Sequence, residues 1–140
     1  EDVNWEIVAI TLVDERWVDE NSERSNARLV KEHLLAGPAS VAAFVPLYAG
    51  TPEPDATGIA KSNAALDRLP MPFDAVVLGM GNDGHTASFF PGGDTLQDAL
   101  NADGPVIAIN APGAGEPRET MPVRAVLSQN HIPVSLFWCP

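Results

Sequence analysis

The chain has 140 residues, of which 45% are hydrophobic and 19% are charged, so it is long enough to bury the core of one globular domain. Its net charge of −11 comes from 8 Lys and Arg against 19 Asp and Glu, and it repels nucleic acid and anionic membranes. The same charge repels phosphorylated metabolites. An anionic substrate therefore needs a local cluster of the few basic residues.

Cys139 is the single cysteine, so an internal disulfide is excluded and no Cys/His spacing typical of a metal site is present. No apolar run approaches the roughly 20 residues of a membrane span. We therefore expect a cytoplasmic protein without a nucleic-acid or membrane partner, and the pattern leaves its oligomeric state open.

The first half of the chain alternates strand and helix patterns. An apolar, β-branched run over 7–13 predicts a strand covered on both faces, and a helix is expected from Ser22 or Glu23 to Leu35, with Asn21 or Ser22 as its N-cap. A short strand is predicted over 41–47, and a second helix over 55–69.

The second half begins with another predicted buried strand, at 73–78. A glycine-rich segment follows at 79–93, then a helical turn at 96–100 and a third strand at 106–109. The segment 123–127 is ambiguous, and 134–138 is strand-like. This alternation predicts an α/β fold with a mostly parallel sheet and flanking helices, and we expect residues 1–140 to form one domain.

The segment directly after the first strand is polar and contains Asp14, Glu15 and Arg16. A guanidinium at a strand end is suited to binding phosphate. An equally weighted alternative is an internal pair between Arg16 and a carboxylate that braces the loop, with Trp17 serving only to fill the core.

The glycine-rich segment places His85 just beyond the second predicted strand, where open parallel sheets bind ligands. An imidazole is suited to general-base work near neutral pH, and Asp83 is close enough in sequence to orient it. Exposed N–H groups here, or at a short helix beginning near His85, can hold an anion. A lone loop histidine is nevertheless more often structural than catalytic.

Two strings in these segments, VDERWV followed by SN, and LGMGNDGHTASFFPG, resemble the central motifs of the 6-phosphogluconolactonase family. The spacing between them, about sixty residues, is also similar. The resemblance covers residues 5–120 and implies a fold like that of NagB, RpiA and the CoA transferases, a modified Rossmann arrangement. It also implies hydrolysis of 6-phosphoglucono-δ-lactone to 6-phosphogluconate in the oxidative pentose phosphate pathway, without a cofactor or metal.

The resemblance also implies roles for individual residues. His85 would activate the water that attacks the lactone carbonyl, with Asp83 beside it as the second catalytic residue. Arg16 would hold the phosphorylated substrate, and the other residues of the implied binding site are Asp14, Asn26, Gly81, Gly84, Thr86 and Arg118.

The chain departs from the family pattern at several places. No Ser/Gly-rich phosphate loop precedes the first motif, and the later P-R-I-T-like segment reads Pro117-Arg118-Glu119-Thr120. The residues from 123 onward match poorly, and no Lys-containing segment follows. We therefore expect an incomplete copy of the domain, lacking the N-terminal phosphate loop and the C-terminal part, with weak or no turnover.

Two other functions stay open at this point. One is a glucosamine-6-phosphate deaminase- or isomerase-like enzyme of the same fold, although the motif strings favour the lactonase. The other is a catalytically silent fragment that keeps only the core of the fold, an alternative that the missing phosphate loop favours.

Overall fold

The computed structural model describes residues 3–93, 96–102, 104–110 and 123–127. Arg118 and the predicted strand over 134–138 therefore lie outside the described residues. The elements, in chain order, are the 3-10 helix η1 (Trp5–Ile7), β1 (Ala9–Thr11), β2 (Asp14–Arg16), α1 (Asn26–His33), the 3-10 helix η2 (Pro38–Val41), β3 (Ala43–Val45), α2 (Ala56–Leu66), α3 (Leu96–Leu100), β4 (Val106–Asn110) and β5 (Val123–Leu127).

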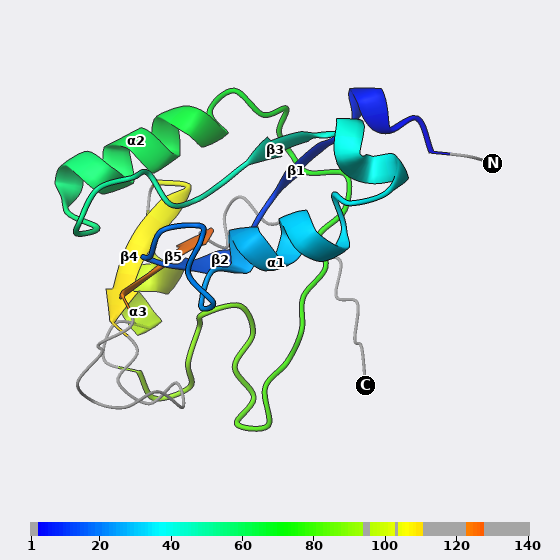
Figure 1. The fold of residues 1–140 in the computed structure, drawn as a ribbon. Helices are drawn as coiled ribbons and strands as arrows, with labels where there is room; N and C mark the ends of the chain where they lie inside the picture. The colour runs from blue at the N-terminus through cyan, green and yellow to red at the C-terminus, as the bar shows by residue number, and fades with distance from the viewer. Residues whose placement is uncertain (1–2, 94–95, 103, 111–122, 128–140) are drawn as a thin grey trace.

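The strands form a parallel pair and a three-stranded antiparallel sheet (Figure 1). β1 and β3 lie parallel, with Ile10 opposite Phe44, and the Thr11 hydroxyl donates to the Val45 carbonyl at 2.8 Å. In the other sheet β5 lies between β2 and β4 and runs antiparallel to both. The described sheets are thus parallel in one part and antiparallel in the other.

Both predicted long helices are confirmed, with shorter bounds. α1 begins one residue after Ser25, whose hydroxyl accepts from the Arg28 N–H at 3.2 Å, so Ser25 is the N-cap and the prediction of Asn21 or Ser22 was wrong. α2 begins after Asp55, whose carboxylate accepts from the Gly58 N–H at 2.8 Å. Such caps satisfy N–H groups that have no partner within the helix.

The main core combines residues of α1, α2 and β4 with residues that follow β1, β2 and β3. Trp17 is buried in it, packs edge-on against Tyr48 at 5.4 Å between ring centroids, and donates its indole N–H to the Thr51 carbonyl at 2.8 Å. The other buried members are Leu12, Ala27, Leu47, Leu66, Leu69 and Val106. The expectation that Trp17 serves packing is therefore confirmed.

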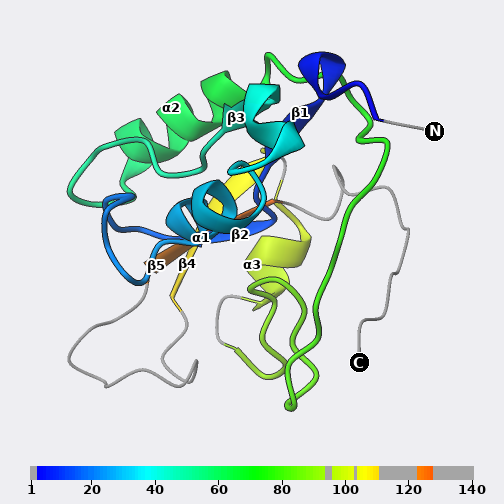
Figure 2. The same ribbon diagram turned by 45° about the vertical axis from the view of Figure 1, so that its right-hand side comes forward.

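Two strand predictions differ from the structure. The run over 7–13 is divided between η1, β1 and the start of the path to β2, and Ile7 is 82% exposed. The run over 73–78 forms no strand, and Val77 is 76% exposed. A strand exists only where a neighbour accepts and donates its backbone hydrogen bonds, and no described strand pairs with this run. It lies on an extended stretch of chain, drawn in green, that runs down one side of the molecule (Figure 2).

Candidate active site

The first group of site residues lies where β2 meets the start of α1. The amide of Asn26 donates to the Asp14 backbone carbonyl at 3.0 Å and to the Asp14 carboxylate at 3.2 Å. Its oxygen accepts a hydrogen bond from Nη1 of Arg16. Asn26 therefore connects the two ends of β2 and fixes the direction of the guanidinium. Nε of Arg16 is buried without a hydrogen-bond partner among the described residues.

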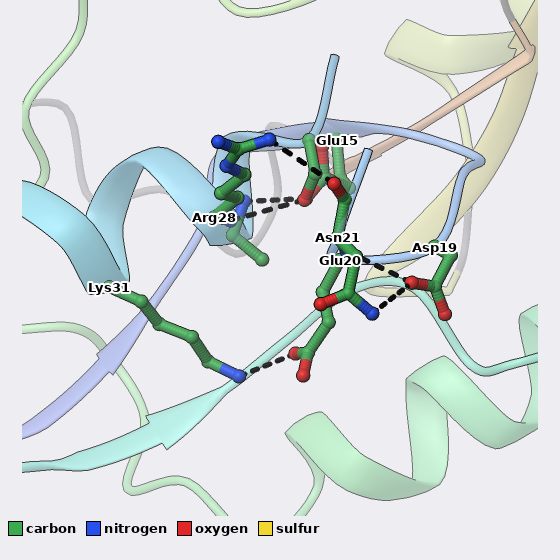
Figure 3. A network of polar contacts seen from close by, with 8 residues as sticks. Glu15, Asp19, Glu20, Asn21, Arg28 and Lys31 are labelled. Atoms are coloured by element: carbon green, nitrogen blue, oxygen red, sulfur yellow. Dashed lines mark hydrogen bonds and ion pairs between the residues drawn. The ribbon is translucent and has the colours of Figure 1, made fainter. Parts of the chain in front are cut away.

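Glu15, between these two residues, is completely buried and accepts hydrogen bonds on both carboxylate oxygens. One oxygen accepts from the N–H groups of Arg16, at 2.8 Å, and Asn26, at 2.7 Å. The other accepts from the Ala27 N–H at 2.7 Å and the Ser25 hydroxyl at 3.2 Å. The carboxylate thus faces the N-terminus of α1 (Figure 3), where a negative charge is favoured by the helix dipole.

The loop that joins β2 to α1 is held against the helix by surface contacts (Figure 3). Lys31 pairs with Glu20 at 2.5 Å, and Arg28 donates to the Asn21 carbonyl at 3.2 Å. The loop-bracing interpretation of the acidic and basic residues is therefore correct in part. Glu15 does brace the chain, but through backbone N–H groups and Ser25, whereas the Arg16 guanidinium contacts the uncharged amide of Asn26.

The second group lies in the loop that carries His85. Nδ1 of the imidazole lies 2.5 Å from the Asp83 carboxylate, which also accepts from the His85 backbone N–H at 3.2 Å. Both contacts lower the pKa of Asp83 below its ordinary value, and the contact with the imidazole ring is the larger cause. The ring packs on Phe90 at 4.5 Å between centroids, and the His85 side chain keeps 31% of its surface exposed, so water can reach it.

Backbone contacts shape this loop around the imidazole. The Gly81 N–H donates to the His85 carbonyl at 2.8 Å, and a side chain at Gly81 would overlap the imidazole ring. Gly84 has a φ of +85°, a conformation that favours glycine. Thr86 forms β-bridges with Met80 and Phe89. No helix begins near His85 in the described part of the chain, so the suggested anion site at such a helix was wrong.

One buried side chain joins the two groups. Ser88 is 1% exposed, and its hydroxyl donates to the Asp14 carboxylate at 2.6 Å across 74 positions of sequence. The path of contacts from the His85 loop therefore runs through Ser88 and Asp14 to Asn26 and Arg16.

The structure thus clusters Asp14, Arg16 and Asn26, and separately clusters Gly81, Asp83 and His85. The sequence indicated Ser88 only as a hydroxyl donor in the His85 loop and Glu15 only as a member of the polar segment after the first strand, without the partners of either residue. Ser88 lies three residues after His85 within the second motif, but the position of its partner became known only from the fold.

Among the described residues, neither a metal-ion site nor a membrane-spanning helix is found. No group of three His, Cys, Asp or Glu side chains there is arranged to hold a metal ion. No helix in the described ranges combines the length and apolar character required to cross a bilayer.

Comparison with known proteins identifies the family. The profile described as "Glucosamine-6-phosphate isomerases/6-phosphogluconolactonase" matches residues 1–136. A 6-phosphogluconolactonase of Rhizobium meliloti is 38% identical, with 99% of this chain and 76% of the relative aligned. The corresponding protein of Mesorhizobium japonicum is 40% identical, with 99% and 73% aligned.

Solved structures agree with these relatives. A crystal structure of a 6-phosphogluconolactonase from Shewanella baltica superposes with a TM-score of 0.82 at 40% identity, over 94% of this chain and 54% of that one. The chain therefore spans about half the length of that structure, and the expected fold is confirmed. The matching relatives carry the lactonase name, which favours that branch over the isomerase or deaminase branch. The chain belongs to the glucosamine-6-phosphate isomerase/6-phosphogluconolactonase family.

Proposed function

We propose that this site hydrolyses 6-phosphoglucono-δ-lactone to 6-phosphogluconate, with His85 as general base and Arg16 as a ligand of the substrate phosphate. The relatives named for this activity support the reaction. The observation that carries the assignment of the site is the Ser88–Asp14 hydrogen bond at 2.6 Å, because it ties the His85 loop to the Arg16 cluster.

The imidazole geometry suits the abstraction of a proton from water. An Nδ1–H donated to Asp83 leaves the lone pair on Nε2, the nitrogen that then accepts the proton. The resulting hydroxide attacks the lactone carbonyl, and the ring C–O bond breaks from the tetrahedral intermediate. The imidazolium returns its proton to the departing ring oxygen, so the base is regenerated.

Arg16 supplies a cation that a phosphorylated substrate requires in a chain with a net charge of −11. Its guanidinium is oriented by the amide of Asn26, an uncharged group, so this contact does not neutralise it. Arginine binds phosphate through paired N–H donors in a fixed plane. We therefore assign Asp14 and Asn26 to the positioning of Arg16, and Gly81, Gly84 and Thr86 to the shape of the His85 loop. Arg118 stays a further phosphate-ligand candidate outside the described residues.

The test compares His85→Ala with the unmodified chain. Lactone hydrolysis is followed through 6-phosphogluconate dehydrogenase and corrected for spontaneous ring opening, and His33→Ala serves as a control because His33 is exposed in α1. We expect the His85 variant to lose about 10²–10⁴-fold in turnover, the usual contribution of a general base. If the unmodified chain hydrolyses the lactone faster than the spontaneous reaction, an unchanged rate in His85→Ala would refute the role of His85.

The two alternatives have their own outcomes. Release of ammonia from glucosamine 6-phosphate would favour the deaminase, and lactone turnover indistinguishable from the spontaneous rate would favour the silent fragment. Because the chain spans about half of the solved Shewanella structure, we expect its turnover to be weak. We also propose a cytoplasmic location and a phosphorylated sugar lactone as the small-molecule partner, with residues 1–140 as a single partial domain.

A further inference from the structure

We propose that Ser88 is a positioning residue, which holds His85 in its working place by anchoring the loop to Asp14. The inference rests on the proposed role of His85 as base. Ser88 itself is buried and its hydroxyl is bound to Asp14, so we expect its effect on His85 to pass through the loop.

The contacts within the loop join its residues into one unit. The Phe89 N–H donates to the Thr86 carbonyl at 3.0 Å, and Thr86 also bridges to Met80 across the loop. With the Gly81–His85 backbone bond at 2.8 Å, these contacts hold the residues around His85 relative to one another. The place of the loop relative to the rest of the protein depends on other contacts, which are the packing of Ala87, Phe89 and Phe90 against Ala99 and Ile109 and the hydrogen bond of Ser88.

The Ser88 hydroxyl supplies an anchor to the rest of the protein. It is 1% exposed and donates at 2.6 Å to Asp14, which is tied in turn to Asn26 and β2. A hydrogen bond to a carboxylate is among the stronger ones in proteins, and this one is partly buried. Without it only the apolar contacts place the loop, so we expect a shift of a fraction of an ångström, and a misplacement of about 1 Å can cost about 10²-fold in rate.

The chain offers a matched control for this serine. Ser62 in α2 is 2% exposed, and its hydroxyl donates at 2.6 Å to the Leu47 carbonyl, in the core and outside both site clusters. Ser88→Ala and Ser62→Ala therefore remove the same group from similar burial and a hydrogen bond of the same length, with a carboxylate as the acceptor for Ser88 and a backbone carbonyl for Ser62. A purely structural role predicts similar effects from both substitutions.

We expect Ser88→Ala to lower kcat by about 10- to 100-fold with KM changed less than about threefold, because the reacting geometry is lost while the Arg16 cluster remains. Ser62→Ala should leave both constants unchanged despite a comparable fall in Tm. Ser88→Cys, which keeps the size and a weak donor, should give an intermediate kcat and keeps the test open if the alanine variant does not fold.

A second measurement does not depend on turnover. The imidazole resonances of His85, assigned by their loss in His85→Ala, should shift in Ser88→Ala and stay in place in Ser62→Ala. Unchanged kcat and unchanged His85 resonances in Ser88→Ala would overturn the inference, as would a change confined to KM. If His85→Ala keeps full activity, the proposed function fails, and the resonances still decide whether Ser88 positions the ring.

Discussion

Replacing Glu15 by Gln tests how the start of α1 is held. The carboxylate accepts four hydrogen bonds, two on each oxygen, and glutamine has one oxygen to offer. In its better orientation the new amide donates to the Ser25 oxygen and leaves the Ala27 N–H without an acceptor. One buried unsatisfied N–H costs about 1–3 kcal/mol, and loss of the charge facing the helix dipole adds about 0.3–1 kcal/mol. We therefore expect the free energy of unfolding to fall by about 1.3–4 kcal/mol.

Urea unfolding at neutral pH measures this difference, provided that the slope with urea concentration is unchanged. The control is Glu32→Gln, which breaks the exposed i,i+4 pair between Glu32 and Arg28 in the same helix, at 2.7 Å. Such surface pairs contribute about 0–1 kcal/mol. A loss below 1 kcal/mol for Glu15→Gln, or one equal to that of Glu32→Gln, would show that the buried carboxylate does not stabilise α1 in the way described.

Two further predictions concern the His85 loop. Gly81→Ala should separate His85 from Asp83, because the new methyl group would overlap the imidazole and lie 2.9 Å from the Asp83 carboxylate. We therefore expect turnover to fall at least about tenfold. Gly79→Ala is the control and should change turnover little, because its methyl group meets nothing within 4 Å. The second prediction is that an NMR titration finds the pKa of Asp83 below its ordinary value and finds it raised in His85→Ala, because the ring contact is the first cause of the lowering. A carboxyl with a lowered pKa stabilises the folded loop above its unfolded pKa, so this stabilisation should disappear as the pH falls below about 4; an Asp83 pKa that is the same with and without the imidazole would contradict the pairing.

The helices were predictable because their signals are local. Asp55 stands three residues before the Gly58 N–H that it caps, and Ala27 and Val30 both face the core, as their spacing predicts. The start of α1 was misplaced because the sequence offers several capping residues in succession, from Asn21 to Ser25. The buried Glu15, eleven residues before Asn26, decides among them by binding the N–H groups of Asn26 and Ala27.

The absence of a strand over 73–78 was not predictable from the residues of this run, because a strand depends on its neighbours. Its apolar pattern is that of a strand buried on both faces, yet Val77 is exposed in the structure. The alignment with the Rhizobium meliloti protein extends over 177 positions against the 140 residues of this chain, a difference of 37. At least 37 aligned positions therefore hold no residue of this chain. The pattern therefore identified an apolar run but not the neighbouring strands that such a run requires.

The arrangement of charge at the site explains why Arg16 is the group to examine for substrate binding. A helix N-terminus often binds anions, but the first N–H groups of α1 already face Glu15 and the Ser25 hydroxyl. No other helix in the described ranges begins near His85, so no other helix N-terminus there can bind an anion in place of that of α1. The acidic chain repels a phosphorylated substrate at long range, so attraction must come from a cation near the base. We propose that Arg16 supplies this cation, because Asn26 orients its guanidinium and the Asp14–Ser88 bond links it to the loop of His85.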